Sequence, residues 1–138
     1  MKNFKKITGI PILILIVMLS VFNSCKKDER KPPLIVFKTG GNYISSDDSV
    51  AKGTTITVGI KADKTEDELS TLNVSYAYDG ASSTISKDNF SIPSKENEHY
   101  QKDYAITTRN QAGREKWSFT ITDKDGNIAN LILVLTVY

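Results

Sequence analysis

The sequence has 138 residues, with 18 lysines and arginines against 16 aspartates and glutamates, one histidine and one cysteine. A single cysteine excludes a disulfide framework, and one histidine leaves no Cys/His cluster that would hold a metal. Because positive and negative side chains are interspersed, we expect no nucleic-acid partner, which would require a basic face. The length fits one domain, whose stability must come from a packed core.

The first 24 residues have the profile of an export signal. Three lysines and no acidic residue make the amino end positive, and an apolar run follows over residues 7–22. The strongly apolar part, residues 12–22, is shorter than the roughly 20 apolar residues that a membrane-spanning helix needs. We therefore expect residues 1–24 to be a cleaved signal peptide, with an uncleaved anchor helix as the alternative.

The residues at the end of this signal, Ser24 and Cys25, resemble the lipobox of bacterial lipoproteins, although Phe22 stands where that family prefers leucine. The resemblance implies that the Cys25 thiol carries a diacylglycerol, that the mature chain begins there, and that the membrane is a partner. The alternative is an unmodified thiol beside an ordinary cleavage site. Removal of 24 residues with their three lysines leaves 114 residues and a formal net charge of −1.

The segment 25–33 is charged and contains two prolines but no aliphatic or aromatic side chain, so we expect an extended tether. Its start, Lys26-Lys27-Asp28-Glu29, resembles the signal by which Bacteroidota send lipoproteins to the outer face of the outer membrane. This resemblance implies an outward-facing protein. The alternative is a solvated tether that carries no address.

From residue 34 onward, apolar side chains recur at every second position, which is the pattern of half-buried strands. The predicted inward positions are Ile56, Val58, Ile60, Ala62, Leu72, Val74, Tyr76, Tyr78, Tyr100, Tyr104, Ile106, Trp117, Phe119 and Ile121. Residues 131–137 are apolar on both faces, with Leu133 in one set and Ile132 in the other. This segment predicts a central strand, or one covered on both sides.

Turn-forming residues separate these segments, as in the run Asp123-Lys124-Asp125-Gly126-Asn127, and no helix of three turns is visible. About seven short strands predict an all-β fold, a single antiparallel immunoglobulin-like β-sandwich over residues 34–138. Residues 117–127 and the β-rich end resemble the closing hairpin of bacterial Ig-like and PKD-like domains. That resemblance implies a binding, adhesion or spacer module, although a fold does not by itself fix a function.

Two sets of residues are candidates for metal binding or catalysis. Asp123, Asp125 and Asn127 resemble the start of a calcium loop, but the later positions of an EF-hand are missing and tight turns select the same residues, so we expect a plain turn and no cofactor. The histidine, His99, has no nucleophile-elbow sequence to work with. Carboxylate pairs for glycoside hydrolysis would come from Glu66, Glu68, Glu96 and Glu98. A domain of this size has little room for the cleft that hydrolysis needs, so we expect no enzyme.

The aromatic residues bear on ligand binding, because rings on a β-face can stack on sugars. Tyr76, Tyr78, Tyr100, Tyr104 and Trp117 are in phase with the aliphatic residues of their strands, which favours packing in the core over a sugar platform. Tyr43, near a loop, and Tyr138, at the chain end, are outside these patterns and are candidate ligand contacts.

Together these features predict a monomeric domain on an outer-membrane surface lipoprotein, acting as a non-catalytic binding, adhesion or spacer module. Its expected partners are the membrane, through the lipid on Cys25, and a glycan or surface protein. The alternatives are a carbohydrate-binding accessory protein of a glycan-capture system, a periplasm-facing assembly factor, and a small hydrolase.

Overall fold

The computed structural model describes residues 30–138. The predicted signal peptide, the predicted lipid attachment at Cys25 and residues 26–29 of the predicted tether lie outside the described residues. Within residues 30–138, no helix is long and apolar enough to cross a membrane.

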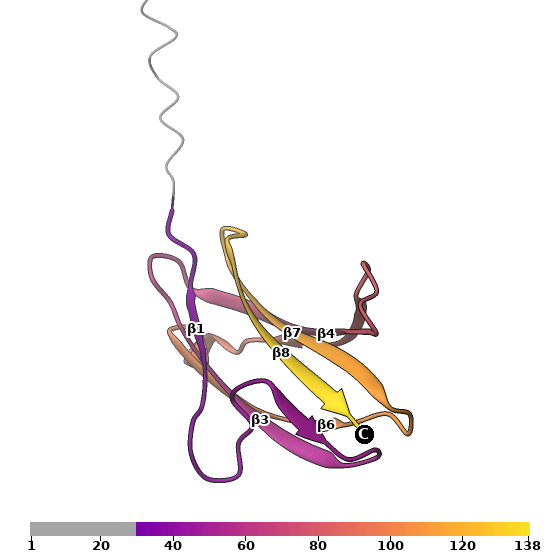
Figure 1. Cartoon of the computed structure of the whole chain (residues 1–138). Helices are drawn as coiled ribbons and strands as arrows, with labels where there is room; N and C mark the ends of the chain where they lie inside the picture. The colour runs from indigo at the N-terminus through magenta and orange to yellow at the C-terminus, as the bar shows by residue number, and fades with distance from the viewer. Residues whose placement is uncertain (1–29) are drawn as a thin grey trace, which may run out of the picture.

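The described chain folds into two β-sheets packed face to face (Figure 1), with a short 3-10 turn, η2 (Ser94–Glu96), before one strand. The strands are β1 (Leu34–Phe37), β2 (Asp48–Val50), β3 (Thr55–Asp63), β4 (Leu69–Tyr78), β5 (Ile85–Ser91), β6 (His99–Thr107), β7 (Gly113–Asp123) and β8 (Ile128–Val137). One sheet has the order β1-β3-β6 and the other β2-β8-β7-β4-β5. All pairs are antiparallel except β2 with β8.

This arrangement is an immunoglobulin-like β-sandwich, as the alternating pattern predicts. The described chain has eight strands where about seven were predicted, because its first extended segment changes sheets. β1 pairs with β3 in the three-stranded sheet, whereas β2 pairs with β8 in the five-stranded sheet. The chain thereby begins in one layer and crosses to the other before β3, so each sheet gains one edge strand from the same segment.

The core lies between the sheets and uses the predicted inward positions. Val58, Ile60, Leu72, Val74, Phe119, Ile121, Leu133 and Leu135 have no exposed surface. The Phe119 ring contacts Phe37 from β1 and Tyr104 from β6, each at a centroid distance of 6.0 Å and nearly edge to face. Such contacts add to the burial of apolar area and join the two layers.

Residues 131–137 belong to an interior strand, which is the first of the two predicted arrangements, but they are not covered on both sides. β8 is an interior strand of its sheet, but β2 pairs with it only from Leu135 to Val137. Its inward residues Leu133 and Leu135 are fully buried, whereas Ile132 keeps 50% of its surface exposed. The outer face of β8 is therefore partly open to solvent at Ile132, within the part of the chain that the structure describes.

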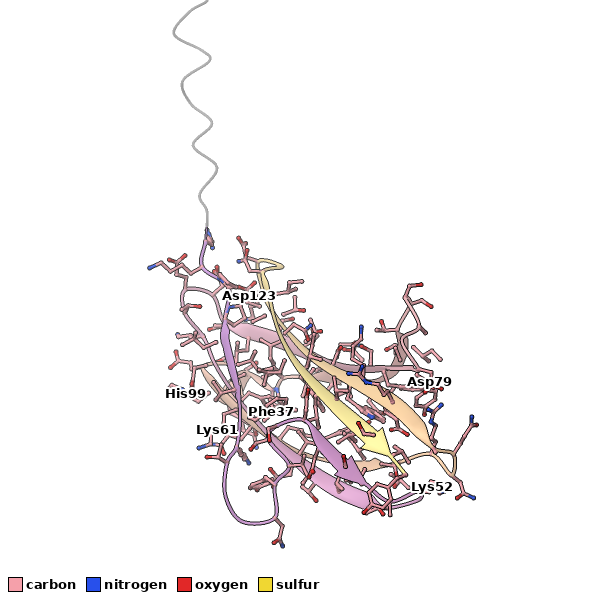
Figure 2. The ribbon with its side chains drawn as sticks, viewed as in Figure 1. Phe37, Lys52, Lys61, Asp79, His99 and Asp123 are labelled. Atoms are coloured by element: carbon pink, nitrogen blue, oxygen red, sulfur yellow. The ribbon has the colours of Figure 1, made fainter. Side chains whose placement is uncertain are left out.

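The last residues of the predicted tether, 30–33, contact the domain instead of extending freely. Arg30 pairs with Asp67 at 2.7 Å and lies 3.5 Å from a carboxylate oxygen of Asp125. The Thr65 hydroxyl donates to the carbonyl of Pro32 at 2.5 Å. The chain therefore enters the domain beside the β3–β4 loop and the β7–β8 turn. Figure 2 shows Asp123 near this entry and Asp79 and Lys52 on the other side of the molecule.

Candidate binding pocket

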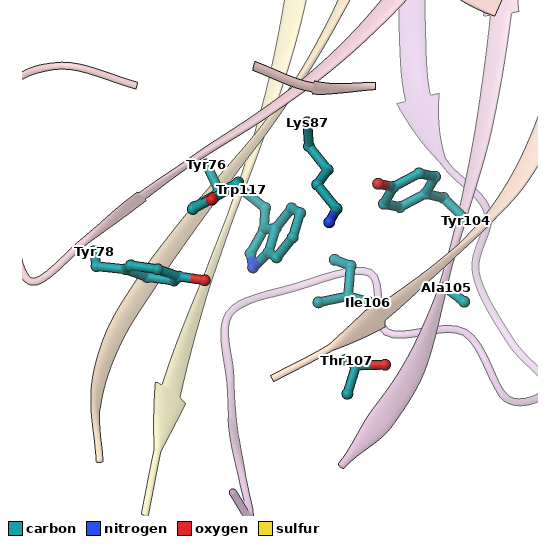
Figure 3. A pocket seen from close by; sticks show the side chains of 8 residues that line it. All are labelled: Tyr76, Tyr78, Lys87, Tyr104, Ala105, Ile106, Thr107 and Trp117. Atoms are coloured by element: carbon teal, nitrogen blue, oxygen red, sulfur yellow. The ribbon is translucent and has the colours of Figure 1, made fainter. Parts of the chain in front are cut away.

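A pocket of about 200 Å³ opens where the two sheets part at one side of the sandwich. β5 ends one sheet and β6 ends the other, and these edge strands do not pair with each other. The residues that line the pocket are Tyr76, Tyr78, Lys87, Tyr104, Ala105, Ile106, Thr107 and Trp117 (Figure 3). Four strands therefore contribute to one concave surface.

The aromatic wall of the pocket follows from the pairing of β4 with β7. Tyr76 lies opposite Trp117 in that ladder, and their ring centroids are 5.2 Å apart. Tyr78 packs against Tyr76 at 4.9 Å, and Tyr104 from β6 lies 6.4 Å from Trp117. Trp117 and Tyr104 are only 4% and 8% exposed, whereas Tyr76 and Tyr78 are half-buried. The first two rings form the floor and the two half-buried rings form the rim.

The cation of the pocket comes from a β-bulge in β5. Val74 pairs with Asp88 and the next residue, Ser75, pairs with Ser86, so Lys87 is the extra residue of β5. Bulges re-aim a side chain away from the regular alternation. Figure 3 shows the Lys87 amine reaching over the space between Trp117 and Tyr104. Lys87 forms no ion pair with any residue from 30 to 138.

The third side of the pocket is the free edge of β6. Thr108 N donates to Thr54 O at 3.0 Å, so the even-numbered residues of β6 exchange hydrogen bonds with β3. Hydrogen-bonded and non-hydrogen-bonded pairs alternate along an antiparallel ladder. Ala105 and Thr107 therefore turn their backbone N–H and C=O groups away from β3, toward the edge where the pocket lies. The pocket thus includes backbone donors and acceptors without a strand partner among the described residues.

A charged network behind the rim holds these rings in place. Glu115 is fully buried and accepts hydrogen bonds from Trp117 Nε1 at 3.0 Å and from Arg109 N at 2.8 Å. The Arg109 guanidinium forms a two-point contact with Asp79, at 2.7 and 2.5 Å, and lies 4.6 Å from the centroid of the Tyr78 ring. The hydrogen bonds from Arg109 hold the pKa of Asp79 below its ordinary value. The network joins the β4–β5 turn to the segment between β6 and β7.

The opposite end of the pocket is closed by a contact between the two sheets. The hydroxyl of Tyr104, on β6, donates to the carboxylate of Asp88, on β5. Burial, together with this carboxylate, raises the pKa of Tyr104. Tyr104 therefore stays protonated at physiological pH and acts as a fixed donor.

Sequence reasoning placed the rings correctly in the core phase but missed the pocket that they line. Tyr100, Tyr104 and Trp117 are buried, as predicted, and Tyr76 and Tyr78 are half-buried. Core packing and a ligand site are not alternatives in this fold, because the same rings pack in the core and line a cavity. Glu115 was also missed. The sequence feature that could have identified Glu115 is the presence of a carboxylate two positions before Trp117, in phase with the inward-facing residues of the strand.

The two tyrosines predicted as ligand contacts lie outside the pocket. The Tyr43 hydroxyl donates to Asp103 at 2.9 Å, and the Tyr43 backbone forms an isolated parallel bridge with Thr57 of β3. Tyr138 follows β8 and is 65% exposed. The structure does not bring these two candidates together with the rings of the pocket.

The calcium candidates form the β7–β8 turn. Asp123 is buried, and one of its carboxylate oxygens accepts from the backbone N–H groups of Asp125 and Asn127 at 3.0 and 2.8 Å. The other oxygen accepts from the Asn127 side chain at 3.0 Å. These bonds give Asp123 the turn-stabilising role that was the alternative to calcium. Among residues 30–138, no group of three or more His, Cys, Asp or Glu side chains is placed to hold a metal ion.

The candidate catalytic groups are spread over the surface, and none lines the pocket. The His99 ring lies 2.7 Å from Asp63 on the outer face of β6 and β3. Glu68 pairs with Lys124 and Glu98 with Lys64. The remaining two carboxylates lie near the tether, where Glu66 accepts from Lys31 N at 3.2 Å, and beside Lys95, where Glu96 is 3.7 Å from the ammonium.

No family model matches the sequence, and no curated protein matches it either. The fold is similar to part of a β-glucosidase from Listeria innocua in complex with glucose, with a TM-score of 0.48 and 10% identity over 77% of this chain and 16% of that one. It is also similar to murine CRIg, with a TM-score of 0.42 and 9% identity over 78% and 99% of the two chains. A chain from the complex of a CaDoc0917 variant with CaCohA2 gives a TM-score of 0.39 and 13% identity over 76% and 100%. The chain thus spans less than a fifth of the β-glucosidase, and we take no ligand or activity from these similarities.

Proposed function

We propose that this protein is a lipid-anchored, non-catalytic binding module on the outer face of the outer membrane, with the edge pocket as its binding site. The observation that carries the proposal is the placement of the pocket relative to the tether. The chain enters beside the β7–β8 turn, whereas the pocket is built from the ends of β4 and β6 and the first half of β7. β4 begins at Leu69, opposite Asp123 at the end of β7, and β6 begins at His99, opposite Asp63 at the end of β3, so the pocket lies in the half of the sandwich away from the entry point.

The length of the tether supports this orientation. Arg30 is held by Asp67 and Asp125, and Cys25 is five residues earlier. Five residues of extended chain span at most about 17 Å. If Cys25 carries lipid, the end of the domain with the β3–β4 loop and the β7–β8 turn is held close to the membrane surface. The pocket then faces away from the membrane, where a ligand can reach it.

The chemistry of the pocket favours binding over catalysis. General acid–base or nucleophilic catalysis needs a titrating group near the operating pH within reach of a substrate. The ionisable lining groups are Lys87 and three tyrosines, and burial raises the pKa of Tyr78 and Tyr104. The carboxylates nearby are engaged by protein donors. Groups held in this way orient a ligand rather than transfer its protons.

Anchoring and exposure can be tested on cells with an added thiol. Ser82 is exposed in the β4–β5 loop, in the half of the domain that holds the pocket, and Cys25 is the only native cysteine. A lipidated Cys25 is a thioether and does not react with maleimide. We expect a membrane-impermeant maleimide to label the Ser82→Cys protein on intact cells as fully as on lysed cells.

The anchor itself is tested by Cys25→Ser, which should remove the protein from the membrane fraction or stall it unprocessed, because two or three acyl chains are needed for firm anchoring. Labelling of Ser82→Cys only after the outer membrane is opened would place the domain inside and contradict the proposal. An uncleaved Cys25→Ser protein that still fractionates with membranes through its apolar segment would contradict the lipid anchor.

A further inference from the structure

The groups of the pocket that are available to a ligand are hydrogen-bond donors more than acceptors. Lys87 brings an ammonium with three N–H donors and has no ion-pair partner among the described residues. The two tyrosines of the rim add hydroxyl groups. A ligand that fits this set must present strong acceptors.

The carboxylates around the pocket do not compete for the ligand as acceptors, because each has donors of its own. Asp79 is held by the two-point contact with Arg109, and Glu115 accepts from Trp117 Nε1 and Arg109 N. Asp88 accepts from the Tyr104 hydroxyl. A cationic ligand would find no carboxylate directed at it from the described residues, whereas an anionic ligand would find the Lys87 ammonium.

The rings set the shape of the ligand. Tyr76 and Tyr78 are half-buried at the rim, above a floor of Trp117 and Tyr104, so part of each side chain is open to a ligand. Aromatic faces carry negative charge density and pack against apolar or slightly positive surfaces, such as the C–H face of a pyranose ring. The cavity of about 200 Å³ is smaller than the 300–1,000 Å³ of ordinary drug-sized sites, so it holds one ring and not a chain of them.

The free edge of β6 suits a small ligand and not an added strand. Between Lys102 and Tyr104, side chains of β6 contact β5 and so obstruct this edge. The Lys102 ammonium lies 4.3 Å from the centroid of the Phe90 ring, and the Tyr104 hydroxyl donates to Asp88. Only residues 105–107 line the open pocket along that edge. Strand addition gains its affinity from a run of main-chain hydrogen bonds, and three residues offer too few. The free N–H and C=O groups of Ala105 and Thr107 match single hydroxyl groups instead.

We infer that the edge pocket binds a single acidic sugar residue, a pyranose with a carboxylate, whose ring packs on Tyr76 and Tyr78 and whose carboxylate pairs with Lys87. This inference rests on the proposed binding function and names the ligand class of the same site. The Lys87 ammonium selects the charged sugar over its neutral counterpart. The backbone groups of Ala105 and Thr107 bind its hydroxyl groups.

Trp117 supplies the readout, because it is the only tryptophan of the chain and forms part of the pocket floor. The full-length protein, purified in detergent micelles, is titrated with the methyl glycosides of glucuronate and galacturonate, and separately with those of glucose and galactose. We expect a saturable change in Trp117 fluorescence with a uronate, and affinity for the matching neutral sugar at least about tenfold weaker. Tenfold corresponds to about 1.4 kcal/mol, which one charge-assisted hydrogen bond supplies.

Variants at Lys87 test the role of the charge. Lys87→Met keeps most of the side-chain length without the ammonium and should remove the preference for the uronate, whereas Lys87→Arg should retain it. Lys95→Met is the matched control, because Lys95 lies in η2, is 81% exposed and does not line the pocket. Lys87 is exposed, so its variants should fold as the parent does, and their unfolding curves check this.

Equal affinity for charged and neutral sugars, undiminished uronate binding by Lys87→Met, or no saturable change with any of the four glycosides would each overturn the inference. Tighter binding of tetraglutamate than of either uronate would assign the pocket to an acidic peptide and overturn it as well. These failures are separable from failure of the proposed location. Labelling of Ser82→Cys on intact cells without any sugar binding would contradict only the inference about the ligand. Uronate binding in micelles by a protein that faces inward on cells would contradict only the proposed location.

Discussion

Trp117 Nε1 donates a hydrogen bond of 3.0 Å to Oε2 of Glu115, two residues earlier on the same strand, and both side chains lie inside the sandwich. The other oxygen of Glu115 accepts from the backbone of Arg109 at 2.8 Å, outside β7. One buried carboxylate therefore satisfies an indole and a loop amide that would otherwise be left without an acceptor. It also orients the ring on which the pocket floor depends.

Replacing Glu115 should destabilise the protein according to how many donors lose their acceptor. Glu115→Leu removes both acceptors and should lower the free energy of unfolding by about 3 kcal/mol or more, whereas Glu115→Gln keeps one acceptor oxygen and should cost about half as much. Urea denaturation followed by Trp117 fluorescence measures both values. Gln111→Ala, at an exposed loop position, is the control. A Glu115→Leu protein within about 0.5 kcal/mol of the parent would show that the network does not stabilise the fold.

The two faces of the β7–β8 ladder should respond differently to truncation. Phe119 is fully buried, and Phe119→Ala should cost about 3 to 5 kcal/mol through lost transfer energy and the cavity left behind. Ile132, on the outer face of β8, is 50% exposed, and Ile132→Ala should cost less than about 1 kcal/mol. Chemical denaturation of the two variants compares them directly. A large loss at Ile132 would mean that something covers the outer face of β8.

Gly113 and Gly53 provide a matched pair of glycines with positive φ, at 145° and 67°. An added Cβ at Gly53 meets nothing within 4 Å, so Gly53→Ala should cost about 1 kcal/mol of backbone strain alone. At Gly113 the Cβ would lie 1.9 Å from Arg109 Nη2 and 2.3 Å from Asp79 Oδ1. Gly113→Ala should therefore break the contact between Arg109 and Asp79 and cost clearly more in thermal or chemical unfolding. Equal costs at the two positions would contradict a rigid contact.

Stability should fall in acid because of carboxylates that are paired in the folded state. Hydrogen bonds from Arg109, Lys38 and Lys64 lower the pKa values of Asp79, Asp103 and Glu98, respectively, from ordinary values of 3.8, 3.8 and 4.5. A carboxylate with a lowered folded-state pKa contributes stability that is complete above its unfolded value and disappears as the pH falls through the folded value. We therefore expect the free energy of unfolding to be level above about pH 5 and to decline below about pH 4.

Among these three carboxylates, Asp79 belongs to the largest hydrogen-bond network, and Asp79→Asn tests its contribution. Asparagine tolerates the positive φ of 51° at this position, so the substitution removes the charge without adding backbone strain. The variant should be less stable at pH 7 and lose less stability between pH 5 and pH 2 than the parent does. Asp48→Asn, at an exposed position without an ion pair among the described residues, should keep the slope of the parent. Parallel pH profiles for parent and Asp79→Asn would contradict a role of this pair in acid stability.

The sequence by itself determined which side of β3, β6 and β7 is buried. Side chains alternate across a strand whatever its partners are, so Val58, Ile60, Phe119 and Ile121 show their phase in the local pattern alone. The closing turn is equally local, because Asp123 bonds to amides only two and four residues away. These are properties of short segments, and the sandwich follows from summing them.

Only the tertiary structure decided where the pocket lies and what it contains. Tyr104, Lys87 and Trp117 come from three strands in two sheets, and nothing in their spacing along the chain shows that β5 and β6 are the edges between which the sheets part. The outer face of β8 is a second example, because the apolar sequence there did not show whether other residues cover that face. Pairing between distant segments decides which strand becomes an edge and which faces are covered. It also decides where a bulge directs a lysine toward the pocket. That pairing is settled by the packing of the whole domain, because local patterns mark a buried side but not the partner that buries it.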